Sequence, residues 1–409
     1  IVVDLKRMNR LLWASTEDHL AGFEVGIIGQ TLEDELNLRG LTLGHFPSSI
    51  YCSTLGGWLA ARSAGQMSSR YGKIEDMVEQ MEVVLADGRV VELFATDLPD
   101  LCSLIVGSEG TLGIITKATM RVHPLADHRI FRAYEFPRIA AGCEGIRRVM
   151  QRGLRPSVLR LYDEMDTLMA RPSAGDRGER RSLLDAAGRL LSARAGQAAG
   201  GDLKPLLLRA ALSRAAMLSK LAESLVPKLR GGCLLIAGFE GDPQIAEAEM
   251  ALAHAELSAA GGADLGQGPG LKWYDHRYAV SYKMSPVFAA GGFVDTMEVA
   301  STWDRLLALY AEVRAALSSA ALVLAHFSHA YSAGCSIYFT FAAAAEGRAR
   351  AEATYDQLWR RGLAAAVRAG GTISHHHGVG LSKAAFMAKE HGESMSVYRQ
   401  AKHLLDPHN

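Results

Sequence analysis

Thr372-Ile373-Ser374-His375-His376-His377-Gly378-Val379-Gly380 is the most informative stretch of this 409-residue chain. Imidazole is the side chain whose unperturbed pKa allows proton transfer near neutral pH, and glycine lets a backbone approach a flat ring closely. Adjacent histidines also occur in metal-binding tracts and in solvated loops. We expect no metal here, because no second Cys, His or carboxylate cluster with ligand spacing accompanies the run. His375, His376 and His377 are therefore candidate catalytic residues.

Two stretches rich in Gly, Ser and Thr lie far upstream of this run. Residues 46–58 supply hydroxyl and backbone N–H groups on a tight loop, which suits the phosphate or carbonyl oxygens of a cofactor. A second turn, Gly107 to Gly113, leads into a strand at Ile114. Taken alone, each composition is also that of an ordinary surface loop.

Together with the histidine run, these loops resemble the alkyl-dihydroxyacetonephosphate synthases. That family belongs to the vanillyl-alcohol-oxidase, PCMH-type flavoprotein superfamily. The resemblance covers nearly the whole chain and implies noncovalent FAD. It also implies an α+β fold, in which a PCMH-type FAD-binding domain precedes a cap domain of antiparallel sheet and helices. The residues that it places at FAD are Ser48, Ser49, Ser53, Thr54, Ala61, Arg62, Ser63, Ala64, Glu109, Gly110, Thr111, Leu112, Gly113, Ile114 and Ile115.

The sequence pattern of the chain changes near residue 126. Upstream, short β-like runs alternate with helix and Gly/Ser loops, and Asp87-Gly88 predicts a two-residue hairpin. Downstream, strands expected at 157–161, 233–239, 293–298 and 335–341 are separated by long helical stretches, which is typical of an α+β domain. We expect an FAD-binding domain in 1–125 and a cap (substrate) domain in 126–350. A C-terminal segment, 351–409, would return the histidine run to the flavin.

Both ends of the sequence read as cut. The chain starts at Ile1 rather than Met and stops at Asn409, just after Leu-Asp-Pro-His. The family's first glycine-rich pyrophosphate loop precedes the strand expected at Ile1, so the chain as given is expected to bind FAD weakly. A targeting signal would be invisible.

Two further residues are catalytic candidates by resemblance. Tyr338, in the alternating strand Cys335–Phe341, matches the proton-transferring tyrosine of the synthases. A phenol acts as a base at neutral pH only if nearby positive charge depresses its pKa, and we expect the histidine run to supply that charge. Arg160, in the context Ser-x-x-Arg-Leu, matches a required arginine that can hold an anionic substrate or flavin charge. An ordinary strand tyrosine and a solvated arginine are the plainer alternatives.

The chain matches only some of the residues through which the synthases contact their substrate. His45 matches a histidine of the family's loop. The synthases contact the substrate phosphate through the arginine of a Tyr-x-Arg-Asp stretch, and here Tyr282-Lys283-Met284-Ser285 corresponds to it. Lys283 can replace the charge of that arginine, but not its bidentate geometry.

The resemblance implies a reaction in which a fatty alcohol replaces the acyl group of acyl-dihydroxyacetone phosphate, a step of ether-lipid synthesis without net redox change. Met284 favours an alternative, an FAD-dependent 2-hydroxy-acid dehydrogenase or oxidase on the same fold. A non-enzymatic flavin-binding scaffold is the third interpretation. The expected partners are a small-molecule or lipid substrate and a second copy of the chain in a homodimer.

Composition excludes some classes of partner. The formal net charge is +0, so no global field favours nucleic acid. The five scattered cysteines favour a reducing intracellular compartment. That compartment is the cytoplasm or a membrane periphery, or the peroxisome for a eukaryotic synthase. Residues 203–230 form a basic amphipathic pattern, which indicates either peripheral membrane contact or a helix packed on its own sheet.

Overall fold

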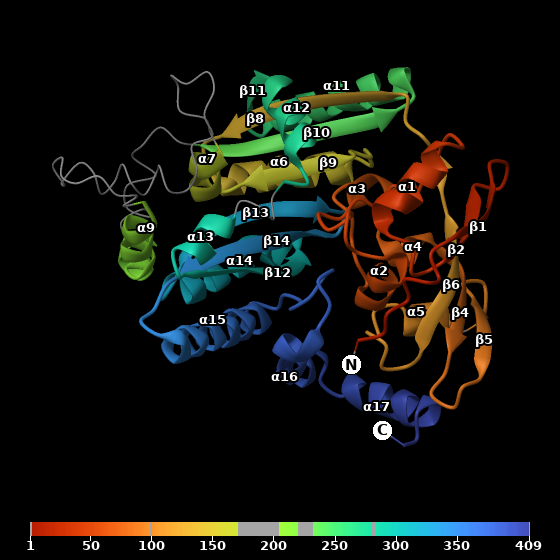
Figure 1. Ribbon diagram of the computed structural model, residues 1–409. Helices are drawn as coiled ribbons and strands as arrows, with labels where there is room; N and C mark the ends of the chain where they lie inside the picture. Colours follow the sequence, from red (N-terminus) through yellow and green to blue (C-terminus); the bar gives the residue numbers. More distant parts are fainter. Residues whose placement is uncertain (1, 99, 171–203, 220–231, 280–283, 409) are drawn as a thin grey trace.

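The computed structural model describes residues 2–98, 100–170, 204–219, 232–279 and 284–408. Two antiparallel sheets, each accompanied by helices, form two units that lie side by side (Figure 1). The expected α+β fold class is therefore confirmed.

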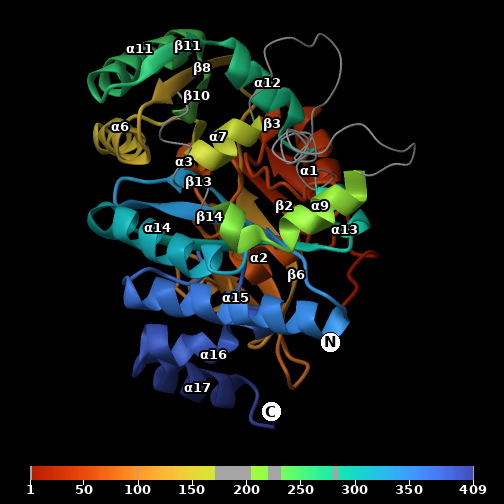
Figure 2. The ribbon, with the colours of Figure 1, turned by 90° about the vertical axis from the view of Figure 1, so that its left-hand side faces the viewer.

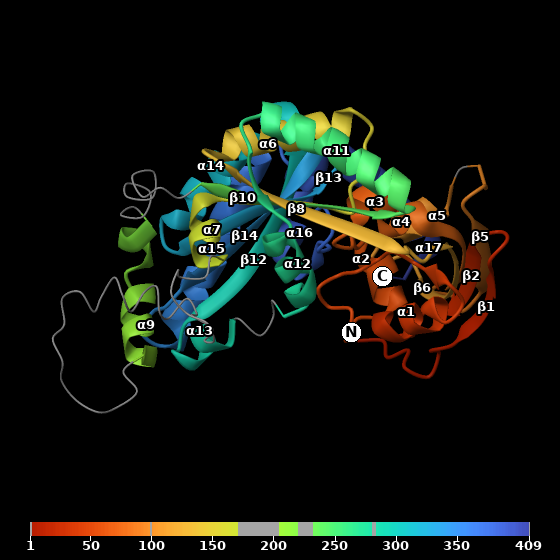
Figure 3. The same cartoon turned by 90° about the horizontal axis from the view of Figure 1, so that it is seen from above.

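The first unit is a five-stranded sheet in the order β1-β2-β6-β4-β5. Its hydrophobic core joins the sheet to α1 and α2, and α2 lies between this sheet and the second unit (Figures 1 and 3). The elements of this unit are β1 (Leu11–Ser15), β2 (Leu20–Glu24), α1 (Gly29–Asn37), β3 (Leu41–Thr42), α2 (Leu55–Ala61), α3 (Ser68–Tyr71), α4 (Ile74–Met77), β4 (Val78–Val84), β5 (Val90–Phe94), α5 (Cys102–Ile105), β6 (Ile114–Arg121) and β7 (His123–Pro124).

The hairpin predicted at Asp87-Gly88 connects β4 and β5, but its loop is longer than expected. The strands pair through Val84 and Val90, and Leu85 N–H donates to Arg89 O at 2.9 Å. Gly88 has φ 84°, the left-handed conformation that glycine adopts without strain. Three residues therefore separate Leu85 from Arg89, and a three-residue loop is the common alternative to the two-residue turn.

The second unit is built on a seven-stranded sheet in the order β11-β8-β10-β9-β13-β14-β12. Helices α6, α11 and α14 cover one face and share the largest hydrophobic core with it (Figure 3). The opposite face packs near α3 of the first unit and against α12. The elements here are β8 (His128–Phe136), α6 (Ile139–Gln151), β9 (Val158–Tyr162), α7 (Glu164–Ala170), α9 (Lys204–Leu212), β10 (Cys233–Gly241), α11 (Pro243–Ala259), β11 (Ala263–Gly266), α12 (Gly268–His276), α13 (Ser285–Ala289), β12 (Phe293–Thr302), α14 (Trp303–Ser318), β13 (Leu322–Ala330) and β14 (Gly334–Ala343).

The C-terminal segment crosses from the second unit back to the first. Helix α15 (Arg348–Arg368) packs against α14, and α16 (Gly380–His391) and α17 (Ser394–Leu405) follow the histidine run (Figure 2). Tyr398 and Leu405 of α17 pack against the core of the first unit. The Tyr398 hydroxyl lies 2.6 Å from Thr111 Oγ1. The domain boundaries at 125 and 350 remain predictions.

The segment expected to contact a membrane is described only over 204–219. In α9, Leu208 and Leu212 are buried with Val287 of α13, whereas Leu206 is 66% exposed. This part of the segment is thus a helix packed on its own unit, and membrane contact stays a prediction. Among the described residues, no helix combines the length and apolarity that a membrane span requires.

Candidate functional site

Four side chains form a row across neighbouring strands of the seven-stranded sheet. The register pairs Glu298 of β12 with Tyr338 of β14. It also pairs Tyr338 with His326 of β13, and His326 with Tyr162 of β9. Residues directly opposite one another in antiparallel strands share a face, and their neighbours along each strand point to the other face. Those neighbours, such as Phe327, lie in the hydrophobic core, so the row lies on the face toward the first unit.

Glu298 holds the histidine run against this row. Its carboxylate accepts His375 N–H at 2.8 Å and 3.0 Å and His376 N–H at 3.3 Å. The His376 Nδ1 atom lies 3.3 Å from Oε1 of the same carboxylate. Burial alone would raise the pKa of Glu298, but the His376 charge and hydrogen bond, with the adjacent histidines, bring it well below its ordinary value. Sequence reasoning missed Glu298, because only the fold brings it to residues 77 positions away.

Glu109 of the first unit holds the other end of the run. It accepts the backbone N–H of Val379 and, at 2.9 Å, that of Gly380. Gly378 has φ 73°, and a Cβ at that position would lie 2.6 Å from Glu109 Oε1. The position therefore favours glycine for its conformation and for its close approach. Ser374 Oγ closes the loop by donating to Gly378 O at 2.7 Å.

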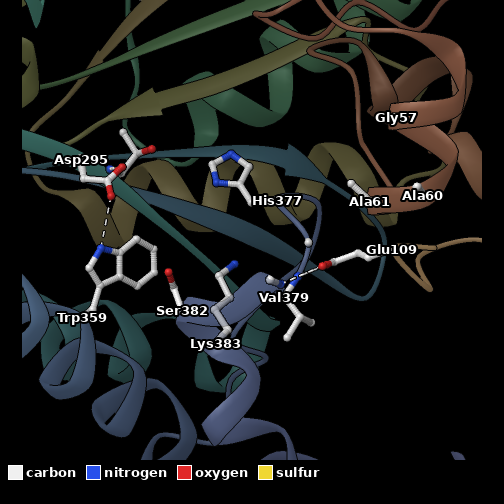
Figure 4. A pocket seen from close by; sticks show the side chains of 13 residues that line it. Gly57, Ala60, Ala61, Glu109, Asp295, Trp359, His377, Val379, Ser382 and Lys383 are labelled. Atoms are coloured by element: carbon white, nitrogen blue, oxygen red, sulfur yellow. Dashed lines mark hydrogen bonds between the residues drawn. The ribbon is translucent and has the colours of Figure 1, made fainter. Parts of the chain in front are cut away.

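A cavity of about 580 Å³ lies where the two units and the histidine run meet (Figure 4). One wall consists of small residues of α2, and the opposite side carries His377 and the buried Lys383. Asp295 accepts a hydrogen bond from Trp359 Nε1 at 3.2 Å at the far end. The lining residues are Gly57, Ala60, Ala61, Glu109, Asp295, Thr296, Trp359, His377, Gly378, Val379, Gly380, Ser382 and Lys383.

The loop at 46–54 folds so that its hydroxyl groups bond largely within the first unit. Thr54 caps α2 by accepting Gly57 N–H at 3.2 Å. Ser49 donates to Ser53 at 3.0 Å, and Ser48 accepts from a glutamine side chain at 3.0 Å. This loop therefore shapes the start of the helix whose residues line the cavity.

The other residues expected at FAD surround the same wall. Ala61 and Glu109 line the cavity, whereas Ala64, Leu112 and Ile115 are buried. Arg62 adopts φ 54° and donates to two backbone carbonyls of the first unit. Ser63 contacts His45, Thr111 contacts α17, and Gly110, Gly113 and Ile114 belong to the turn and strand after Glu109. Their individual roles toward FAD stay predictions.

Tyr338 lies at the centre of the row, among aromatic and basic side chains. His326 stacks on its ring with centroids 4.9 Å apart and an interplanar angle of 17°, and His377 meets the ring edge at 5.0 Å. Burial raises the pKa of Tyr338 above its ordinary value of 10.0, and a hydrogen bond with Thr296 and the charge of Arg160 oppose this rise. Arg160 is therefore a cation that acts on the phenol, and the charge expected from the histidine run stays a prediction.

Burial lowers the pKa of four histidines of the site, His326, His329, His375 and His377. Burial lowers the pKa of His375 to about 4 and that of His377 to about 3. Burial also lowers the pKa of His326 and His329 well below its ordinary value. Protonating any of these rings within the folded protein is unfavourable, because the charged form loses its hydration.

Arg160 and His326 contact each other on the face that carries Tyr338. Arg160 Nη2 lies 2.7 Å from His326 Nε2, and its guanidinium lies 5.3 Å from the ring centroid of Tyr162. The structure thus brings the predicted Arg160 to the predicted Tyr338. Sequence reasoning missed His326, although the alternation of Val323, Ala325 and Phe327 around it indicates a strand.

His329 is a second residue that sequence reasoning missed. It adopts φ 53° at a point where the pairing of β13 with β14 is irregular. Its Nδ1 atom lies 2.8 Å from Ser68 Oγ of the first unit, and its ring lies 4.5 Å from that of His376. A left-handed conformation is uncommon for residues other than glycine. Here it directs the ring to the junction of the two units.

His45, one of the two predicted substrate residues, does not line the cavity. His45 is fully buried beneath the loop that follows it, 4.7 Å from the ring of Trp58 and 3.2 Å from Ser63 Oγ. Its Nδ1 atom has no hydrogen-bond partner among the described residues. Lys283 lies outside the described residues, and Met284 is the residue that precedes α13. Substrate contacts through His45 and Lys283 stay predictions.

The cluster at the histidine run also has the composition of a metal site. One ligand atom each from Glu298, His375 and His376 lie within 4.8 Å of one another. Sequence spacing did not reveal this carboxylate, because the fold supplies it. The ion pair of Glu298 with His376 also explains why these ligand atoms lie close together. The expected absence of a metal stays a prediction.

Comparison with known proteins places the chain in a family. The model described as "FAD linked oxidases, C-terminal domain" matches residues 126–409, and the model described as "FAD binding domain" matches residues 1–93. The chain therefore belongs to the FAD-linked oxidases, and the prediction of FAD as cofactor is confirmed. The mixed fold also agrees with that assignment.

Curated relatives and a solved structure agree with the resemblance noted in the sequence. The chain is 29% identical to the alkyldihydroxyacetonephosphate synthase of Trypanosoma brucei brucei over 425 residues, which is 100% of this chain and 64% of that protein. It is 29% identical to the synthase of Dictyostelium discoideum over 423 residues, again 100% of this chain and 64% of that protein. A solved structure of an alkyldihydroxyacetonephosphate synthase matches with a TM-score of 0.72 and 28% identity, covering 99% of this chain and 66% of that chain. The chain thus spans about two thirds of the length of these relatives.

The residues at the cavity fit a flavin. The volume of about 580 Å³ lies in the range of small-molecule sites. Gly57 leaves its wall open, because a Cβ there would meet only Thr54 Oγ1 at 3.4 Å. Gly57, Ala60 and Ala61 would face the flavin from one side, with His377 and Gly378 on the other.

Proposed function

We propose that the chain carries the catalytic site of an alkyl-dihydroxyacetonephosphate synthase-like enzyme, which replaces the acyl group of acyl-dihydroxyacetone phosphate by a fatty alcohol. The observation that carries the proposal is the position of Tyr338, between Glu298 and His326 in the sheet and against His377 of the run. Similarity to the synthases over the whole chain supports the same reaction.

Each residue of the site has a separate role in the proposed reaction. When bound, FAD supplies an electron sink, which allows exchange of the two groups without net redox change. Tyr338 takes the proton from the substrate carbon that bears the acyloxy group, and returns a proton after the exchange. Because burial raises the pKa of Tyr338, its ionised form depends on Arg160 and on the hydrogen bond with Thr296. Glu298 and Glu109 hold the histidine run at a fixed distance from the phenol.

One observation favours a second candidate, an FAD-dependent 2-hydroxy-acid dehydrogenase. Met284 stands where the resemblance expects the arginine that contacts the substrate phosphate. The thioether of Met284 carries no charge that could bind a phosphate. A 2-hydroxy acid has no phosphate group and therefore needs no cation at this position. In this alternative a histidine of the run accepts the hydroxyl proton of the substrate.

Two assays on the FAD-loaded protein separate these functions. For the synthase, labelled fatty alcohol is incorporated when acyl-dihydroxyacetone phosphate is present, and free fatty acid is released in equal amount. For the dehydrogenase, a lactate-like acid bleaches the yellow colour under anaerobic conditions. We expect incorporation without bleaching. Bleaching without incorporation would assign the chain to the second function.

A further inference from the structure

His326 is enclosed by aromatic and charged side chains that the sequence analysis did not connect with it. The residue is 8% exposed and lies between Tyr162 and Tyr338 of the two adjacent strands. Its ring stacks on that of Tyr338, and the ring of Tyr162 lies 5.9 Å away. This enclosure leaves little freedom for the imidazole to turn.

The partners of the two ring nitrogens fix the proton of His326. Arg160 Nη2 lies 2.7 Å from Nε2, and Asp166 Oδ2 lies 3.4 Å from Nδ1. A guanidinium group donates hydrogen bonds and cannot accept them, so Nε2 must be the unprotonated nitrogen. The proton is then on Nδ1, where it faces the Asp166 carboxylate. His326 is therefore a neutral acceptor for Arg160.

Asp166 is itself held by a buried ion pair. Its backbone N–H donates to Asp163 Oδ1 at 2.8 Å, at the start of α7. Asp163 is fully buried, and its other oxygen accepts from Arg314 Nη1 at 2.6 Å and from Tyr310 at 3.1 Å. The segment from Arg160 to Asp166 thus supplies both partners of His326 within seven residues of sequence.

We propose that His326 is a positioning residue, which holds the Arg160 guanidinium against the imidazole that stacks on Tyr338, while Asp166 keeps the imidazole proton on Nδ1. The structural part of this inference stands on geometry alone, and its kinetic part rests on the proposed function. Arg160 acts on Tyr338 through its charge, so its orientation sets how strongly the phenolate is stabilised. A hydrogen bond at 2.7 Å to a ring that is stacked on Tyr338 restricts that orientation.

The test compares His326→Leu with His326→Gln in the FAD-loaded protein. Leucine removes the acceptor, whereas the glutamine amide oxygen can still accept from Arg160. The first readout is the side-chain ¹⁵N–¹H signal of Arg160, assigned by its loss in Arg160→Lys. We expect this signal in the wild type and in His326→Gln, and its loss to solvent exchange in His326→Leu. His254→Leu, which removes a histidine of α11 that contacts Tyr134, serves as the matched control.

The second readout is the turnover of the alkyl exchange. We expect His326→Leu to lower kcat about tenfold or more with KM little changed, since misplacement of a positioned group acts on the chemical step. His326→Gln should stay within about threefold of the wild type. If His326→Leu does not fold, Asp166→Ala tests the arrangement from the other side, and loss of the Arg160 signal is again expected.

The Arg160 signal and the turnover can each contradict the proposal independently of the other. An Arg160 signal that is unchanged in His326→Leu overturns the positioning role, whatever the turnover. Equal kcat in all variants overturns it as well, provided that the wild type performs the exchange. A wild type without alkyl exchange, but with the expected loss of the Arg160 signal, removes the proposed reaction and supports the positioning role.

Discussion

The Glu298 carboxylate accepts the backbone N–H of His375 at 2.8 Å, although 77 residues separate them in sequence. This contact ties the histidine run to β12, one strand away from Tyr338. The run contributes few apolar side chains to either core, so its position depends on such polar contacts. A carboxylate that bonds both backbone and imidazole restricts the direction in which the rings point.

Glu298→Gln tests how much this carboxylate stabilises the fold. The amide retains the volume but loses the charge opposite His376, which leaves a buried group unpaired. We expect the free energy of unfolding to fall by about 3 kcal/mol. Urea denaturation at pH 7 measures the change. Glu352→Gln is the control, because its pair with Arg348 is exposed and should contribute less than about 1 kcal/mol. Equal stability of the two variants would contradict the proposed anchoring.

Tyr338→Phe tests the proton-transferring role. The phenyl ring preserves the stacking with His326, so we expect the fold and the FAD content to remain. Alkyl exchange should fall by about two orders of magnitude or more, the usual scale for a positioned acid or base. Turnover near that of the wild type would remove Tyr338 from the mechanism. Thermal unfolding of both proteins serves as the control for structure.

The pattern of this chain predicted four of the seven strands of the second sheet, β9, β10, β12 and β14, whereas the strand expected at Ile1 is not among the described strands. The alternating stretch at 335–341 placed β14, and the apolar run at 233–239 placed β10, near their observed bounds. The row of Glu298, Tyr338 and His326 depends on the register between three strands. A shift of one residue would turn each side chain to the other face. The pairing of β12 with β14 joins strands that α14 and β13 separate in the sequence, so their register is not visible in a short stretch of sequence.

The orientation of Arg160 could not be predicted from the sequence either. Sequence placed it on a strand, but the charge that it exerts on Tyr338 depends on a hydrogen bond to His326 from a strand more than 160 residues away. Composition indicates that a cation is present and says nothing about what it faces. The charge of the histidine run depends equally on the fold, since burial lowers the pKa of His375 to about 4 and that of His377 to about 3, whereas His376 pairs with the Glu298 carboxylate.

Neutral buried histidines make the fold sensitive to mild acid. His375 and His377 have folded pKa values of about 4 and about 3, below the ordinary value of 6.5. A depressed folded pKa means that the unfolded chain binds protons first as the pH falls. The stabilising contribution is therefore complete above pH 6.5 and is lost as the pH falls toward 4. Each such histidine contributes a slope of about 1.4 kcal/mol per pH unit in that window.

Urea denaturation between pH 7.5 and pH 5 measures this slope. His377→Gln removes one of the titrating groups and should give a shallower decline than the wild type. The exposed His391 is the control position, and His391→Gln should keep the wild-type slope. A free energy of unfolding that is constant across this range would show that these rings take up protons in the folded protein as readily as in the unfolded chain.

We predict that FAD is held without a covalent bond. A histidyl linkage needs a histidine that reaches the cofactor, and His45, the candidate near the first loops, is fully buried and does not line the cavity. Acid precipitation of the holoprotein should leave the yellow colour in the supernatant. Colour retained in the washed pellet would contradict this prediction.

The last prediction concerns the histidine run itself. His377→Ala should abolish turnover while substrate binding remains, because His377 lines the cavity and meets the edge of Tyr338 rather than the hydrophobic core. His376→Ala should behave in the same way and should also weaken the fold, since it removes the partner of Glu298. Isothermal titration with the substrate separates binding from turnover in both variants.

Chelation distinguishes this role from that of a metal site. Glu298, His375 and His376 can together offer three ligand atoms, so a bound ion is the direct rival of the ion pair. We expect full activity after dialysis against EDTA, together with loss of activity in the two variants. Inactivation by EDTA that zinc reverses would assign the cluster to a metal. Full activity in both variants would instead show that the run takes no part in the reaction.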